Sequence, residues 1–79
     1  MAILPADEDY ARGLLTIFSA MHVRPGQSLK ASEVNVEFLR RNLGRPADYQ
    51  AALGFSVSQG WLKLELGMIR LTTDGFGET

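Results

Sequence analysis

The stretch 61–72 decides the fold, and it reads Trp-Leu-Lys-Leu-Glu-Leu-Gly-Met-Ile-Arg-Leu-Thr. Apolar and polar residues alternate on both sides of Leu66 and Gly67, as they do in two half-buried strands joined by a short turn. Leucine is an unusual turn residue, whereas glycine is common at the second position. The alternation therefore predicts an antiparallel β-hairpin whose turn lies at these two residues or close to them.

The register of the hairpin follows from the position of the turn. With Leu66 and Gly67 as the two turn residues, one face of the hairpin is apolar and the other is mostly charged. The apolar face pairs Leu64 with Ile69 and Leu62 with Leu71, while the other face pairs Lys63 with Arg70 and Glu65 with Met68. A shift of one residue would mix the two faces, so burial of the apolar face fixes this register.

A first helix is predicted from about Pro5 to Met21. Proline suits the first helical turn, and three acidic residues follow it where the helix dipole favours negative charge. The apolar stripe of this helix consists of Tyr10, Leu14, Ile17, Phe18 and Met21. Pro25-Gly26 ends the helix, because it fits the centre of a turn. The next residues, 27–30, are predicted to form a short edge strand.

A second helix is predicted over 31–43 and a third over 46–59, with Gly44 and Gly60 as the glycines that end them. The second helix has a wide apolar arc made of Ala31, Val34, Val36, Phe38, Leu39 and Leu43. The third has a buried stripe made of Tyr49, Leu53 and Val57, flanked by Ala52 and Ser56. After the hairpin, residues 74–79 are predicted to be a loose tail, so the core spans about residues 5–73.

Composition limits the class of protein. The 79 residues fit one domain, and the absence of cysteine excludes disulfide bridges and thiolate metal sites. The net charge of −1 argues against nucleic-acid binding by bulk charge, although a local basic patch is compatible with it. No apolar run approaches the roughly 20 residues of a membrane span, and residues 1–5 lack the pattern of a signal peptide. We therefore expect a soluble, cytoplasmic domain with no membrane contact.

No group of residues has the spacing of a catalytic site. His22, the only histidine, fits an interaction with the last carbonyls of the first helix better than the role of a catalytic base. The acidic residues 7–9 are explained by the helix dipole. The glycines form neither a phosphate loop nor a dinucleotide motif. We expect no enzyme, no cofactor and no metal.

Five short stretches resemble those of a known superfamily in both order and character. They are Asn42-Leu43-Gly44, Tyr49-Gln50-Ala51-Ala52-Leu53, Gly60-Trp61-Leu62-Lys63, Ile69-Arg70-Leu71-Thr72 and Asp74-Gly75. Together with the order helix, short strand, helix, turn, helix, hairpin, they resemble the winged helix-turn-helix superfamily over roughly residues 10–75. The resemblance implies an α+β fold with three helices, an edge strand and a C-terminal hairpin wing. It also implies recognition of DNA or of a protein, because this fold serves both.

The first interpretation of the surface is DNA binding. The residues predicted to contact the phosphate backbone are Arg40, Arg41, Arg45, Lys63 and Arg70, with Gln50 as the candidate to touch a base. The alternative is that these cations are ordinary solvated residues. Glu37 stands three and four residues before Arg40 and Arg41, and Glu65 accompanies Lys63, so local ion pairs would account for them.

The second interpretation is protein interaction or homodimerisation. The predicted third helix has no arginine or lysine, and its outward ridge consists of small residues that let another backbone approach closely. The candidate contact residues are Ala51, Gly54, Phe55, Leu66 and Met68. The alternative is that the small residues are merely good helix formers on a surface. Analogy with the superfamily favours DNA, whereas the residues of the third helix favour a protein partner.

Overall fold

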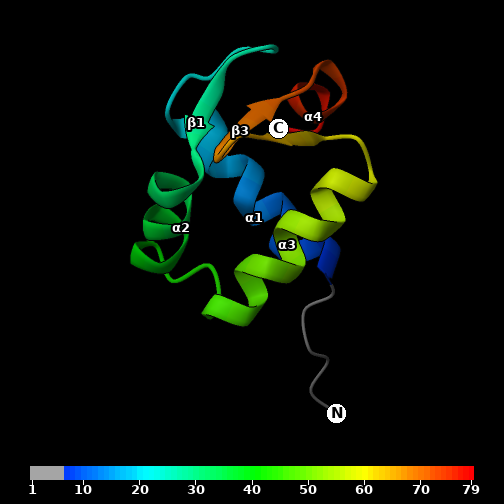
Figure 1. Ribbon diagram of the computed structural model, residues 1–79. Helices are drawn as coiled ribbons and strands as arrows, with labels where there is room; N and C mark the ends of the chain where they lie inside the picture. The colour runs from blue at the N-terminus through cyan, green and yellow to red at the C-terminus, as the bar shows by residue number, and fades with distance from the viewer. Residues whose placement is uncertain (1–6) are drawn as a thin grey trace.

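Four helices and a three-stranded antiparallel sheet make up residues 7–79, the part of the chain that the computed structural model describes (Figure 1). In chain order they are α1 (Asp7–Ala20), β1 (Ser28–Lys30), α2 (Ala31–Arg40), α3 (Pro46–Ser58), β2 (Leu62–Glu65), β3 (Met68–Leu71) and α4 (Thr73–Gly77). The strand order is β1-β3-β2, so β1 is an edge strand as predicted. The predicted α+β class is confirmed. The predicted start of the first helix at Pro5 and the features of residues 1–5 lie outside the described residues.

The hairpin has the predicted register, but the predicted burial of its apolar face is wrong at Leu64, which is exposed. Strand β2 pairs with β3 through Leu62 and Leu71, Lys63 and Arg70, Leu64 and Ile69, and Glu65 and Met68. Leu66 (φ 48°) and Gly67 (φ 77°) both have left-handed backbones, as the two central residues of a type I′ hairpin turn do. The carbonyl of Gly67 accepts a hydrogen bond from the Ala31 N–H at 2.9 Å. This bond joins the hairpin turn to the first residue of α2.

The core lies between α1, α2, α3 and the inner face of the sheet. Its fully buried large side chains include Leu14, Ile17 and Phe18 from α1, Val34 and Phe38 from α2, and Leu62, Ile69 and Leu71 from the hairpin. The rings of Phe38 and Tyr49 meet edge to face at 5.6 Å, and the Tyr49 hydroxyl donates to the Ala31 carbonyl at 3.3 Å. Each buried side chain of this size contributes about 1.5–3 kcal/mol, so these contacts fix the positions of the helices around the sheet.

Helices α1, α2 and α3 end in the same way. Each has a left-handed residue just beyond its last turn, and the N–H of the residue immediately after it donates back to a carbonyl of that turn, as Val23 does to Phe18, Leu43 to Phe38 and Trp61 to Ser56. The left-handed residues are His22 (φ 57°), Asn42 (φ 54°) and Gly60 (φ 76°). Gly60 was predicted in this role, but the prediction that Gly44 ends the second helix is wrong. Asn42 tolerates the left-handed backbone, and α2 therefore ends at Arg40, before the predicted position.

Three predicted apolar stripes are wider than the faces that the structure buries. Met21, Val57, Val36 and Leu39 were all assigned to apolar faces, and all four are exposed. Met21 and Val57 lie at or beyond the last turn of their helices, where the core no longer covers them. Val36 and Leu39 point away from Val34 and Phe38, the two residues by which α2 enters the core.

The prediction that residues 74–79 are a loose tail is wrong over residues 74–77, which belong to α4 (Thr73–Gly77). The Thr72 hydroxyl accepts from the Gly75 N–H at 3.0 Å and donates to the Gly60 carbonyl at 2.6 Å, so it caps α4 and fastens it to the end of α3. Gly75 is buried against the backbone of Trp61. Glu78 then bonds to Arg12 of α1 at 3.1 Å. Gly75, part of the segment predicted to be loose, is the glycine that allows the close packing.

Candidate nucleic-acid interface

The outward surface of the sheet gathers charged side chains from all three strands. Lys63 stands opposite Arg70 across β2 and β3, and Arg70 stands opposite Ser28 across β3 and β1. In the next row Glu65, Met68 and Lys30 lie side by side. Directly paired residues of antiparallel strands share a face. We call this surface the outer sheet face, and its members are Ser28, Lys30, Lys63, Glu65, Met68 and Arg70.

Cations outnumber carboxylates on the outer sheet face. Arg70 bonds to Glu65 at 3.0 Å, whereas Lys30 and Lys63 form no ion pair with any residue of the described range. All three cations are exposed. Like charges directly opposite each other repel across a pair of strands, and the Glu65 carboxylate offsets part of the repulsion between Lys63 and Arg70. A bound anion would remove this repulsion.

An open hollow of about 410 Å³ adjoins this surface where the hairpin meets α4. Lys63 and Arg70 line one part of it, and Thr72, Thr73 and Asp74 line another. The two cations and the Thr73 hydroxyl suit a phosphate, whereas the Thr72 hydroxyl already donates to the Gly60 carbonyl. Asp74 is the one lining residue whose charge opposes a phosphate. Contacts of this kind fix a nucleic acid in place without reading its sequence.

The structure separates the other predicted contact residues from the sheet. Arg40 and Arg41 lie at the end of α2, and Arg45 lies at the start of α3, on the opposite side of the domain from the strands (Figure 1). Arg45 is 3.6 Å from Asp48. Gln50 is exposed on α3. The structure thus brings together Lys63 and Arg70 but does not join them to the arginines of α2 and α3.

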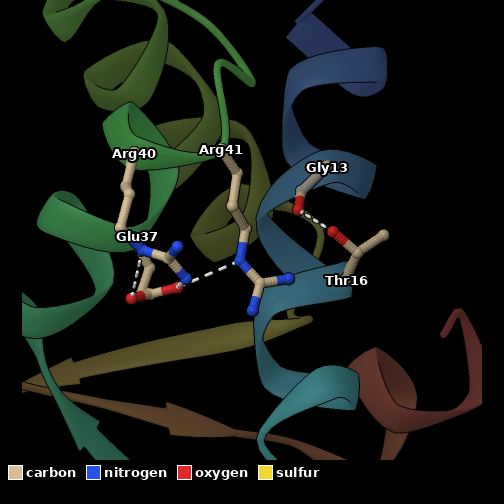
Figure 2. Close-up of polar contacts among 5 residues, drawn as sticks. All are labelled: Gly13, Thr16, Glu37, Arg40 and Arg41. Carbon is tan, nitrogen blue, oxygen red and sulfur yellow. Dashed lines mark hydrogen bonds and ion pairs between the residues drawn. The ribbon is translucent and has the colours of Figure 1, made fainter.

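Glu37 holds both arginines at the end of α2 (Figure 2). Arg40 donates two hydrogen bonds to its carboxylate, at 3.0 and 2.7 Å, and Arg41 donates a third at 3.0 Å. Hydrogen bonds from Arg40 and then from Arg41 lower the pKa of Glu37 from 4.5 to about 2. Arg40 and Arg41 therefore form the local ion pairs that the solvated-residue interpretation predicts.

We expect Glu37 to titrate near pH 2 in an NMR pH titration of its side-chain carboxyl carbon. Because the folded-state pKa is depressed, the stabilisation from this cluster is present above pH 4.5 and is lost as the pH falls toward 2. The double change Arg40→Gln and Arg41→Gln should return the pKa toward its ordinary value. Arg45→Gln removes a cation that does not contact Glu37, so it should leave the titration unchanged. A Glu37 that titrates normally in the unaltered protein would contradict the cluster.

The residues predicted for protein interaction do not form one surface. Phe55 is half-buried, and its ring packs edge to face on Trp61 at 5.7 Å, near the base of the hairpin. Leu66 is fully exposed at the other end of the hairpin. Met68 is half-buried on the outer sheet face, Ala51 is half-buried and Gly54 is exposed. Phe55 therefore contributes to packing and lies far along the hairpin from Leu66.

Lys30 belongs to the outer sheet face but was not among the predicted contact residues. It reaches this face because β1 pairs with β3, and a three-residue strand carries too little pattern to predict its partner. In the described range no three His, Cys, Asp or Glu residues are grouped so as to hold a metal ion. Nor has any helix of residues 7–79 the length and apolar character to cross a membrane.

Comparison of the chain with known proteins finds no matching family, no matching curated protein and no matching solved structure.

Proposed function

We propose that this domain is a winged-helix module that binds the phosphate backbone of double-stranded DNA through its outer sheet face. The observation that carries the proposal is the opposed pair Lys63 and Arg70, with Lys30 on the same face and Glu65 as the only carboxylate there. The order of helices and strands and the sheet order β1-β3-β2 support the winged-helix part of the proposal.

The distribution of acidic residues agrees with this orientation. Asp7, Glu8 and Asp9 occupy the first turn of α1, which lies at the far end of the domain from the sheet (Figure 1). A domain with a net charge of −1 can therefore present a basic face to DNA while its acidic end points away. Phosphates attracted to the sheet would not meet these three carboxylates.

The same proposal predicts weak dependence on DNA sequence. Base edges in the major groove are read by Arg, Lys, Asn and Gln side chains. Helix α3 has neither arginine nor lysine, and Gln50 is its one exposed side chain of the reading type within residues 46–58. Backbone contacts supply affinity without sequence information. We infer binding to duplex DNA of any sequence.

Fluorescence anisotropy with a labelled random-sequence duplex tests the proposal. Three phosphate contacts give a slope of about −2.7 for the logarithm of the affinity against the logarithm of the salt concentration, or about a 40-fold loss between 50 and 200 mM salt. The triple change Lys30→Ala, Lys63→Ala and Arg70→Ala should abolish measurable binding. Each single change should lower the steepness of the slope by about 0.9 and the affinity at 50 mM salt by about 10-fold.

Arg45→Ala is the matched control, because it also removes one exposed arginine but lies away from the sheet. It should leave both affinity and slope unchanged. Equal losses from Arg45→Ala and Lys63→Ala would mean that only net charge matters. Absence of binding at 50 mM salt by the unaltered protein would overturn the proposal.

A further inference from the structure

The solvent side of α2 carries apolar residues that the domain does not use. Val36 is 60% exposed and Leu39 is 36% exposed, and Met21 lies beyond them at the end of α1 with 43% of its surface exposed. An open hollow of about 340 Å³ lies between Met21 and α2, lined also by Ser32, Glu33, Val36 and Glu37. Grouped exposed apolar residues next to a hollow are typical of an interaction site.

The apolar residues of α2 lie between an acidic residue at the start of the helix and a basic residue at its end. Glu33 lies in the first turn of α2 and Arg40 lies in its last turn, on the same side of the helix as Val36. Seven residues separate the two charges, which is about 10 Å along the helix axis. Glu33 forms no ion pair with any residue between 7 and 79, and the Arg40 side chain is 63% exposed. One end of this surface is therefore acidic and the other is basic.

Two copies of this surface related by a two-fold rotation are complementary, because the acidic end of each faces the basic end of the other. We propose that it binds a second copy of the chain about a two-fold axis, with the two α2 helices antiparallel. In this arrangement Val36 and Leu39 of both copies pack together, and Glu33 of each copy meets Arg40 of the other, so each ion pair forms twice. We call the surface of Glu33, Val36, Leu39 and Arg40 the α2 face.

The cluster at the end of α2 permits this exchange of partners. Arg40 bonds to Glu37 in the single chain, but Arg41 bonds to the same carboxylate at 3.0 Å. Arg41 thus continues to neutralise Glu37 when Arg40 turns toward Glu33 of the second copy. A contact between two ten-residue helices is small for a stable interface, so we expect weak, concentration-dependent association. This inference is independent of DNA binding, since the outer sheet face takes no part in it.

Sedimentation equilibrium over a range of protein concentrations tests the dimer. The charge reversals Glu33→Arg and Arg40→Glu should each weaken dimerisation by about 10-fold, because two attractive pairs become repulsive. The double variant with both reversals should recover the dimer to within about 3-fold of the original affinity, because the pairs are restored in the opposite sense. Val36→Asp should abolish the dimer.

Val57→Asp is the control for the apolar change, because Val57 is also an exposed valine in a helix, at 40% against 60% for Val36, but it lies on α3. It should leave self-association unchanged, and circular dichroism verifies that every variant is folded. A chain that stays monomeric at millimolar concentration overturns the inference. So does a dimer that tolerates Val36→Asp, or one that the double charge reversal fails to restore.

Discussion

Replacing Gly75 with alanine should lower the free energy of unfolding by about 1–3 kcal/mol, which is the usual cost of an added group in a packed interior. An alanine Cβ at this position would overlap the carbonyl oxygen of Trp61 and lie 2.9 Å from its carbonyl carbon. These are backbone atoms at the start of the hairpin, so they cannot rotate out of the way as a side chain could. Either α4 moves off the domain or the hairpin shifts at its base.

Gly77→Ala is the matched control for this change. Gly77 lies in the same short helix, and a Cβ built there meets no other atom within 4 Å. Alanine is also the better helix former, so stability should stay the same or rise slightly. Urea unfolding followed by Trp61 fluorescence compares the two variants directly. If Gly75→Ala unfolds at the same urea concentration as Gly77→Ala, α4 does not pack on Trp61 as described.

Replacing Phe38 with alanine lowers the free energy of unfolding by about 3–5 kcal/mol. The ring is fully buried and meets Tyr49 edge to face, so the change removes apolar contacts and leaves a cavity where α2 joins α3. A chain of this length has a total stability of roughly 4–12 kcal/mol. The variant should therefore be largely unfolded under mildly denaturing conditions in which the unaltered protein remains folded.

The neighbouring change Leu39→Ala is the control for Phe38→Ala. Leu39 is also a large apolar residue of α2, but it is exposed, so its loss should cost less than about 1 kcal/mol. Both variants are measured by urea unfolding at a protein concentration low enough to prevent self-association. Similar losses for the two would show that α2 enters the core by a different side.

The hairpin could be predicted to the residue because independent constraints agree on it. The alternation of residues 62–65 and 68–71 fixes which side chains share a face, and a turn at Leu66 and Gly67 is the solution that keeps both strands in register. It does not fix burial at the end of the hairpin, where Leu64 is exposed although Leu62, Ile69 and Leu71 are buried. The pairing of Lys63 with Arg70 followed from this register alone. That part of the candidate site was therefore accessible from the sequence.

Helix α2 shows where sequence patterns stop being informative. Its apolar arc is wider than a single buried face, and the spacing cannot tell which half of the arc meets the core. Phe38 and Leu39 are neighbours in the sequence and both belong to that arc, yet Phe38 is fully buried and Leu39 is exposed. The answer depends on how α2 packs against α1 and α3, which are distant in the sequence.

The missing pieces of the site have the same cause. Lys30 joins Lys63 and Arg70 only through the pairing of β1 with β3, across some 40 residues of chain. Helix α4 was not predicted because glycine is a poor helix former in isolation. In the structure Gly75 stabilises this helix by allowing it to pack closely on Trp61. Both features arise from tertiary contacts rather than from local preference.

The hydrogen bond between Ala31 and Gly67 determines the mechanics of the hairpin. A hairpin that projects freely into solvent behaves as a flexible arm and adjusts its shape to whatever it touches. Here the tip is anchored to the first residue of α2, and the base is anchored through Thr72 to the end of α3. The hairpin is thus held at both ends, so a displacement of its surface is transmitted to α2 at the tip and to α3 at the base.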